Sequence, residues 1–323
     1  MTLHRRRVLQ LAAGAATLPA FPRPTLADAY PSRPVQMIVP FPAGSSPDII
    51  ARLSGEWLAE RLGQNFVIQN RPGAGGNIAT EIAVRADADG YTILADVLSN
   101  VLNASLYHHL SFNFLRDIAP VATVANAPYV VLTTQSLPAK TVPELIAYAK
   151  ANPGKINFAS GGIGTASHIF GLLFMTMAGI QLVHVPYRTN YMPDLISGQV
   201  QMVINPIPQA VEFVKAGKVR ALAVTTKERL AALPDLPTMN QFVPGYEAIG
   251  WYGIGAPKNT PRDIVDKLNA AVNAALDQAT PKARLAALGV EPMKKTPAEF
   301  AQFITAENDK WGKVIRAANL KLD

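Results

Sequence analysis

The sequence predicts an α/β fold of two lobes, each with a mainly parallel sheet flanked by helices. Short β-rich apolar runs alternate with helical patterns along the chain, which is typical of parallel sheets covered by helices. Several of the helical segments start and stop at recognisable capping signals. The chain has 323 residues, 49% of them hydrophobic and 16% charged, which suits one large domain or two of moderate size with an ample core.

Nine apolar runs are expected to form the strands, and the last of them should return the chain to the first lobe. They are VQMIV from Val35, FVIQ from Phe66, YTILA from Tyr91, YVVLT from Tyr129, INFA from Ile156, QLVHV from Gln181, VQMVI from Val200, VRALAV from Val219 and GWYGIGAP from Gly250.

Four helices carry boundary or face signals in the sequence. Two are capping boxes, one is a threonine cap followed by a first-turn proline, and one is an apolar face closed by glycine. These signals are Thr141-Val142-Pro143-Glu144 with a stop at Asn152-Pro153-Gly154, Thr296-Pro297-Ala298-Glu299, Thr260-Pro261-Arg262-Asp263, and the face Ile50, Leu53, Trp57 and Leu58 before Gly63.

No low-complexity tract or flexible linker divides the chain, so we expect two closely joined lobes. The most loop-like stretch runs from Leu233 to Gly245 and precedes the returning strand. We therefore predict that residues 30–128 and 248–323 form the first lobe, and that residues 129–247 form the second lobe as an insertion.

The first 29 residues have the layout of an export signal. Arginines at 5, 6 and 7 precede an apolar stretch from Val8 to Ala20, and small residues stand at Ala27 and Ala29. The arginine pair favours a twin-arginine signal, and a general secretory signal is the alternative. Cleavage after Ala29 would release the mature chain into the periplasm. An uncleaved anchor is less favoured because the stretch is short for a membrane span, and no later segment approaches ~18 uninterrupted apolar residues, so we expect a soluble mature protein.

Composition argues against several classes of function. The chain has no cysteine, so neither disulfides nor thiolate sites are available. The net charge of +7 falls to +4 without residues 1–29, and no basic run follows, which argues against nucleic-acid binding. None of the five histidines, His4, His108, His109, His168 and His184, lies in a metal-ligand spacing, so no metal site is expected.

Three predicted strand-to-helix turns are rich in small residues, at positions 42–48, 72–77 and 160–165. Glycine lets the backbone approach a ligand there, and free N–H groups at a helix N-terminus favour an anion. The alternative is that each sequence simply makes a tight turn. Because such turns occur in both halves of the chain, two facing helix starts could clamp a dicarboxylate, or one carboxylate and a polar tail.

Two enzymatic alternatives find weaker support. Gly162-Ile163-Gly164 lacks the third glycine of a dinucleotide fingerprint, and Arg188 follows the next strand where an acidic residue would hold a ribose. An arginine could suit NADP, but export argues against it, and no cofactor is expected. No G-x-S-x-G elbow occurs, so an exported α/β hydrolase would need a triad dispersed in the sequence.

Three polar residues on or near these segments need separate interpretation. Asp48 stands where a helix begins, and we expect it to shape the turn or hold a bridging water because a carboxylate repels an anion. His168 follows the third turn and either donates to a ligand or packs the turn. His184 alternates with valines and is expected to be a core residue.

The mature chain resembles the solute receptors of tripartite tricarboxylate transporters, the Bug family of periplasmic binding proteins. The resemblance is carried throughout the chain by short motifs in a fixed order. They include Tyr30-Pro31-Ser32-Arg33-Pro34, Pro40-Phe41-Pro42-Ala43-Gly44, Asn70-Arg71-Pro72-Gly73-Ala74-Gly75-Gly76-Asn77, Asp89-Gly90-Tyr91-Thr92, Ala151-Asn152-Pro153-Gly154-Lys155, His184-Val185-Pro186-Tyr187-Arg188, Gly198-Gln199-Val200-Gln201 and Ala216-Gly217-Lys218-Val219-Arg220.

The resemblance implies a Venus-flytrap fold that captures a small carboxylate and performs no chemistry on it. Backbone amides, hydroxyls and water would hold the ligand between the lobes, for delivery to a membrane permease or a sensor protein. Thr165 and His168 match the family's second-lobe loop best, and Ser45 would add a hydroxyl donor. The predicted ligand-binding residues are Ser45, Ser46, Asp48, Asn77, Ser99, Gly162, Thr165, His168, Tyr187 and Asn205.

Three departures from the family pattern bear on the ligand. Asn205 stands where the family usually has an aspartate, which argues against a ligand with an ammonium group. Residues 96–100 replace a glycine-containing turn, and residues 189–192 replace a small-residue segment. Tyr191 and Met192 could line a cleft for an aromatic or medium-chain acid, or pack against the lobe surface.

Overall fold

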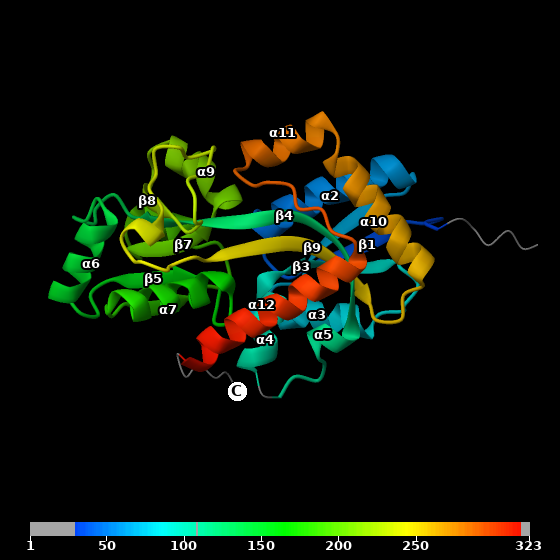
Figure 1. Ribbon diagram of the computed structural model, residues 1–323, viewed down its shortest axis with the longest axis horizontal. Coiled ribbons are helices and arrows are strands. Elements are labelled where there is room, and N and C mark those ends of the chain that lie inside the picture. The colour runs from blue at the N-terminus through cyan, green and yellow to red at the C-terminus, as the bar shows by residue number, and fades with distance from the viewer. Residues whose placement is uncertain (1–29, 108, 318–323) are drawn as a thin grey trace, which may run out of the picture.

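The computed structural model describes residues 30–107 and 109–317, which fold around a nine-stranded mixed sheet (Figure 1). The predicted signal peptide and its cleavage site lie outside the described residues. The strand order is β2-β1-β3-β9-β4-β7-β5-β6, and β8 pairs with β4. The strands are β1 (Val35–Val39), β2 (Phe66–Asn70), β3 (Thr92–Val97), β4 (Ile118–Thr133), β5 (Asn157–Ser160), β6 (Val183–Pro186), β7 (Met202–Pro206), β8 (Arg220–Val224) and β9 (Ile249–Pro257).

The two long strands β4 and β9 join the two lobes of an α/β fold (Figure 1). In the first lobe β1 runs parallel to β2 and β3, and in the second lobe β5 runs parallel to β6 and β7. The predicted two-lobed α/β fold is confirmed, whereas β4 and β9 pair antiparallel with all their neighbours. Strands β4 and β9 are antiparallel to each other because the chain leaves the first lobe along β4 and returns along β9.

Strand β4 changes its partner in mid-strand. Ile118 to Pro128 pair with β9, and Tyr129 to Thr133 pair with β7. The sequence pattern predicted only the second part, because Pro120 and Pro128 interrupt the first part. The register of the first part against β9 also shifts twice. We call β1–β3, β9 and the first part of β4 the first lobe, and β5–β8 with the rest of β4 the second lobe. The lobe boundaries at residues 128–129 and 247–248 remain predictions. The change of partner between Pro128 and Tyr129 supports the first of them.

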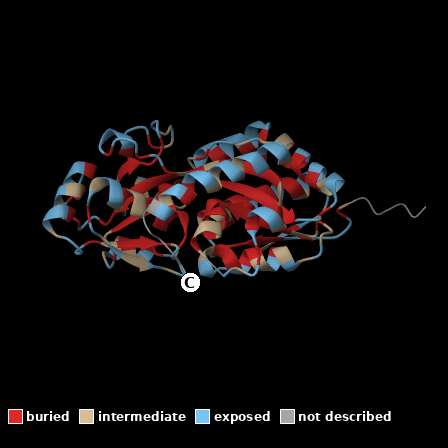
Figure 2. Ribbon diagram, turned by 60° about the horizontal axis from the view of Figure 1, so that its bottom comes forward, coloured by how far each residue is buried: buried red, intermediate tan, exposed pale blue. Residues whose placement is uncertain are grey.

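Helices cover the sheet in both lobes, and their apolar faces supply the buried core (Figure 2). The first lobe carries α2 (Ser46–Leu62), the short η1 (Ala74–Gly76), α3 (Asn77–Arg85), α4 (Leu98–Leu106), α5 (Phe114–Asp117), α10 (Arg262–Leu276), α11 (Ala279–Ala287) and α12 (Pro297–Ala317). The second lobe carries α6 (Val142–Ala151), α7 (Ala166–Ala178), α8 (Met192–Ser197), α9 (Ile207–Lys215) and the short η2 (Met239–Gln241).

Helix α12 ties the lobes together, because Trp311 lies against Phe170 of α7 with ring centroids 4.9 Å apart. Both side chains are almost fully buried. Within residues 30–107 and 109–317, no helix combines the length and the apolar character that a membrane crossing requires.

Of the four helix signals predicted from the sequence, two are confirmed, one is confirmed in part and one is wrong. Gly63 ends α2 with a φ of 73°, and Thr296 and Glu299 exchange hydrogen bonds at the start of α12, as predicted. Thr141 caps α6, but Glu144 accepts from the backbone of Lys140, outside the predicted box. The predicted cap at Thr260 is wrong: Pro261 takes the N-cap position of α10, so the Thr260 hydroxyl is one residue too early to reach the helix.

Candidate functional site

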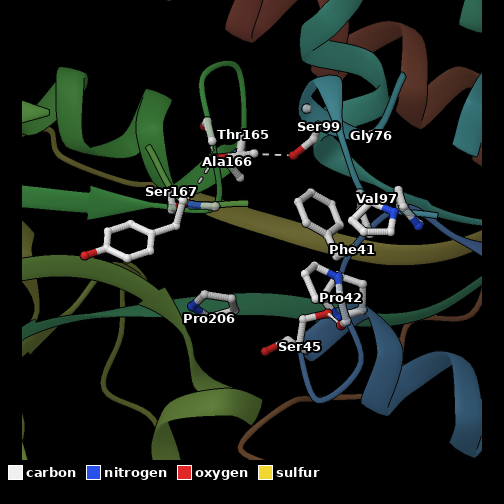
Figure 3. A pocket seen from close by; sticks show the side chains of 18 of the residues that line it. Phe41, Pro42, Ser45, Gly76, Val97, Ser99, Thr165, Ala166, Ser167 and Pro206 are labelled. Atoms are coloured by element: carbon white, nitrogen blue, oxygen red, sulfur yellow. Dashed lines mark hydrogen bonds between the residues drawn. The ribbon is translucent and has the colours of Figure 1, made fainter. Parts of the chain in front are cut away.

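A cavity of about 320 Å³ lies between the two lobes (Figure 3). Its walls come from the loops that precede α2, α3 and α7, from the start of α4, from the loop between β6 and α8, and from the crossing strands β4 and β9. The lining residues are Pro40–Ala43, Ser45–Pro47, Pro72–Gly76, Val97–Ser99, Tyr107, Ala127, Tyr129, Gly161–Ile163, Thr165–Ser167, Pro186–Tyr191, Pro206, Gln209 and Gly250–Tyr252.

The N-terminus of one helix from each lobe opens into this cavity. Ser45 is the N-cap of α2 and Thr165 is the N-cap of α7; both have extended backbone, and neither side chain caps its helix. In α2 the first-turn N–H groups of Ser46 and Asp48 have no partner inside the helix, and in α7 the same holds for Ser167 and His168. The helix dipole adds positive potential at both helix starts. The cavity therefore has a helix start suited to an anion in each lobe, and both come from predicted glycine-rich turns. The third predicted turn, at residues 72–77, also lines the cavity and precedes α3, whose N-cap is Gly76.

The hydroxyls of these two N-cap residues hold their own loops. Ser45 Oγ donates to the carbonyl of Pro42 at 2.6 Å, and Thr165 Oγ1 donates to the carbonyl of Gly162 at 2.7 Å. Gly162 has a φ of 116°, a conformation that other residues rarely adopt. The hydroxyl protons are thus used within the loops, and the backbone N–H groups remain as the donors for a ligand.

Asp48 lies behind the first-lobe loop and fixes its shape. Its carboxylate accepts from Gly44 N at 2.9 Å, from Asn70 Nδ2 at 2.9 Å and from the Arg52 guanidinium at 2.9 and 3.0 Å. Burial opposes ionisation, but these hydrogen bonds together lower the pKa of Asp48 below its ordinary value. An ionised Asp48 therefore holds the loop and does not line the cavity.

Six of the ten predicted site residues line the cavity: Ser45, Ser46, Ser99, Gly162, Thr165 and Tyr187. The other four, Asp48, Asn77, His168 and Asn205, lie buried behind its wall. Asn77 Oδ1 accepts from Asn103 at 2.8 Å, and Asn205 accepts from the Tyr191 hydroxyl at 2.6 Å. The structure thus gives these two asparagines packing partners in place of direct contact with the cavity.

Two stacked histidines support the second-lobe loop from below. His168 Nδ1 accepts from Gly164 N at 3.2 Å, and its ring stacks on His184 at 4.0 Å. Burial, and for His168 also the neighbouring His184, lowers their pKa values to about 3 and about 4. Both rings stay neutral at pH 7. Ser160 pairs with His184 at 2.6 Å, but Ser160 is fully buried outside the cavity wall, so this pair holds the loop and does not present a nucleophile.

Two hydrogen bonds connect the lobes across the cavity. Ser99 Oγ of the first lobe accepts from the backbone N–H of Ala166 at 3.2 Å (Figure 3), and Ser46 Oγ accepts from the backbone N–H of Gln209 at 3.1 Å. Ala166 and Gln209 lie in the first turns of α7 and α9, where N–H groups have no partner in the helix. The two serines therefore hold the lobes together across the cavity.

We expect the double replacement Ser46→Ala and Ser99→Ala to open the cleft. Each lost hydrogen bond is worth about 1 kcal/mol, so the open form should gain about 30-fold relative to the closed form. The radius of gyration from small-angle X-ray scattering should rise. Ser197→Ala, at an exposed hydroxyl bonded within α8, is the control. An unchanged radius of gyration in the double variant would show that the serines do not hold the lobes together.

The cavity wall carries little charge. Among the described residues that line it, none is an aspartate or a glutamate, and the one charged side chain is that of Arg188, which is exposed at the rim. Within the described residues, no group of three or more histidines, cysteines or carboxylates is placed to hold a metal ion. His4 and His108 lie outside that part of the chain.

Sequence reasoning missed several residues of the cavity wall. The wall includes four aromatic residues that it did not single out: Phe41, Tyr129, Trp251 and Tyr252. It also missed Gln209, whose backbone N–H donates to Ser46 of the other lobe. Trp251 and Tyr252 lie on β9, where the sequence indicated only a strand, because the residues across the cleft are far away in the chain. The one available signal was the aromatic pair within GWYGIGAP.

Comparisons with known proteins agree with this geometry. The model of the tripartite tricarboxylate transporter family receptor matches residues 50–320. Protein BugT of Bordetella pertussis is 37% identical over 304 residues, which cover 93% of each chain. The structure of Rpa4515 from R. palustris with adipate shares 35% identity and a TM-score of 0.88, covering 90% of this chain and 99% of that chain. MatC from Rhodopseudomonas palustris with bound malate shares 32% identity and a TM-score of 0.85, covering 88% of this chain and all of that chain. The chain therefore belongs to the family of tripartite tricarboxylate transporter receptors, the solute-binding proteins that include the Bug proteins.

Proposed function

We propose that this protein captures a small carboxylate between its lobes outside the cytoplasm and delivers it to the membrane subunits of a tripartite tricarboxylate-type transporter. One observation carries the proposal: two helix N-termini, one from each lobe, open into a cavity to which residues 30–107 and 109–317 contribute no acidic side chain. Related structures that contain adipate and malate support the choice of a carboxylate.

Capture follows from the same geometry. The ligand carboxylate accepts from first-turn N–H groups of α2 and α7 other than that of Ala166, which donates to Ser99. The folded loops hold these N–H groups in place before the ligand arrives. Contacts from both lobes favour the closed arrangement, and the transporter recognises the closed protein. The proposal includes export by a signal cleaved after Ala29, release into the periplasm, and lobes formed by residues 30–128 with 248–323 and by residues 129–247.

A thermal-shift screen of the purified protein tests the proposal. We expect a mono-, di- or tricarboxylate or an aromatic acid to raise the melting temperature, because a ligand at 100 times its dissociation constant adds about 2.7 kcal/mol of stability. Neutral sugars and peptides are the controls. Stabilisation by a sugar or a peptide, and by no carboxylate, would contradict the proposal.

A matched pair of variants then tests the place of the anion. Ser45→Asp and Ser45→Asn both put a good N-cap residue at the start of α2, but only the first adds a negative charge at the cavity. We expect Ser45→Asp to weaken carboxylate binding by at least about tenfold relative to Ser45→Asn. Isothermal titration calorimetry measures both affinities, and equal affinities would place the carboxylate elsewhere.

A further inference from the structure

The cavity wall is unusually rich in aromatic side chains. Seven of the 35 lining residues are aromatic, whereas aromatic residues make up 7% of the chain. They come from both lobes and from the strands that cross between them. The seven are Phe41, Tyr107, Tyr129, Tyr187, Tyr191, Trp251 and Tyr252.

Two of the lining tyrosines use their hydroxyl protons away from the cavity. Tyr187 donates to Asp194 Oδ2 at 2.6 Å, and Tyr191 donates to Asn205 Oδ1 at 2.6 Å. Their rings meet edge to face, with centroids 6.0 Å apart and planes at 74°. We call this edge-to-face pair of rings the Tyr187–Tyr191 corner. It offers a ligand mainly apolar contact.

Phe41 approaches the second lobe from the other side of the cavity. A Cβ atom placed on Gly161 would lie 3.7 Å from Cε1 of Phe41, so the ring reaches across to the second-lobe loop. Figure 3 shows the Phe41 ring among the residues that line the cavity. The ligand space thus has aromatic surface on both lobes, close to the helix starts that suit an anion.

An ammonium group would find no counter-charge on this wall. No acidic residue lines the cavity in the part of the chain that the structure describes, and the Asn205 oxygen behind the wall already accepts from Tyr191. The one charged side chain at the rim, Arg188, is itself a cation. Burying an unpaired ammonium costs several kcal/mol, so the cavity should discriminate against amino acids.

We infer that the ligand is an aromatic carboxylate without an amino group, with its ring between Phe41 and the Tyr187–Tyr191 corner. This inference rests on the proposed capture of a carboxylate. The size is suitable, because benzene fills an engineered cavity of about 150 Å³ and the cavity here holds about 320 Å³. Space remains for a short carboxylate-bearing chain and for water.

Matched ligands test the inference by isothermal titration calorimetry. Phenylalanine and 3-phenylpropanoate differ only in the ammonium group, and 3-cyclohexylpropanoate differs from 3-phenylpropanoate only in the aromaticity of its ring. We expect 3-phenylpropanoate to bind about threefold to tenfold more tightly than its cyclohexyl analogue and at least about a hundredfold more tightly than phenylalanine. Benzoate, adipate and malate complete the panel.

The outcomes separate this inference from the proposed function. Binding of adipate or malate without binding of any aromatic acid would overturn the inference and leave carboxylate capture intact, as would equal affinities for phenylalanine and 3-phenylpropanoate. Binding of no carboxylate in the panel or in the wider screen would contradict the proposed function itself.

A variant locates the ring. Phe41→Leu keeps an apolar side chain but removes the aromatic face, so it should weaken binding of 3-phenylpropanoate about threefold to tenfold and change binding of the cyclohexyl analogue less. Phe242→Leu, at an exposed ring that does not line the cavity, is the matched control. Equal losses for both ligands would assign Phe41 only an apolar packing role and overturn the placement of the ring. If Phe41→Leu does not fold, the ligand panel decides alone.

Discussion

Replacing Asp96 with asparagine is expected to raise the free energy of unfolding at neutral pH. Asp96 lies on β3, is 1% exposed, and neither carboxylate oxygen has a hydrogen-bond partner among the described residues. Burial raises its pKa well above the ordinary value of 3.8. Asparagine has nearly the same shape and carries no charge, so the substitution removes the cost of keeping a proton on a buried carboxyl without creating a cavity.

The gain from Asp96→Asn should grow with pH. Above pH 3.8 the unfolded chain releases the proton that the folded protein retains, so folding of the parent protein loses about 1.4 kcal/mol for each pH unit until the raised pKa is reached. Below pH 3.8 both states hold the proton and the difference disappears. Urea unfolding of the parent and the variant at several pH values between 4 and 8 measures this slope.

Asp48→Asn is the matched control, because it makes the same chemical change at an equally buried aspartate with the opposite surroundings. Asp48 is 2% exposed and accepts four hydrogen bonds, and its pKa is lowered. Asp48→Asn should therefore destabilise the fold, with the loss appearing above the lowered pKa. A stability difference for Asp96→Asn that does not change with pH would show that Asp96 is ionised in the folded protein.

Gly171→Ala is expected to destabilise the second lobe. Gly171 lies within α7, against the buried ring of Phe158 on β5. A Cβ atom there would lie 2.0 Å from Phe158 Cζ and 2.4 Å from Cε1, distances that real atoms do not adopt. The helix and the strand must separate, at a cost of about 1–3 kcal/mol or more. The loop between β5 and α7 forms part of the cavity wall, so ligand affinity should fall as well.

Gly55→Ala in α2 is the control for this prediction. Gly55 is also a buried helical glycine, but an added Cβ would come no closer than 3.4 Å to its neighbours. Alanine favours the helix by about 1 kcal/mol, so Gly55→Ala should be neutral or stabilising in urea unfolding. Adding Phe158→Leu to Gly171→Ala should recover part of the lost stability, and a purely additive double variant would argue against a clash between the two side chains.

The sequence alone determined the α/β class, most of the strand positions, and the helix starts that face the cavity. These features depend on interactions between residues that are close in the sequence. Apolar periodicity, helix caps and glycine turns can each be recognised within one short segment. For this reason β1 and the end of α2 lie where the pattern predicted them. Ser45 and Thr165 were found because glycine-rich turns before helices are visible in a single segment.

Only the tertiary structure decided which polar residues face the cavity and what else lines it. Asn205 and His168 looked like ligand contacts in the sequence, but the partners that occupy their polar atoms, Tyr191 and Gly164, were not evident there. Ser46 and Ser99 bond to helix starts more than 60 residues away in the chain. Such pairings arise when the lobes fold and close on each other, and no local pattern encodes them. For the same physical reason, the aromatic wall formed by Phe41, Tyr187 and Trp251 emerged only when distant segments met.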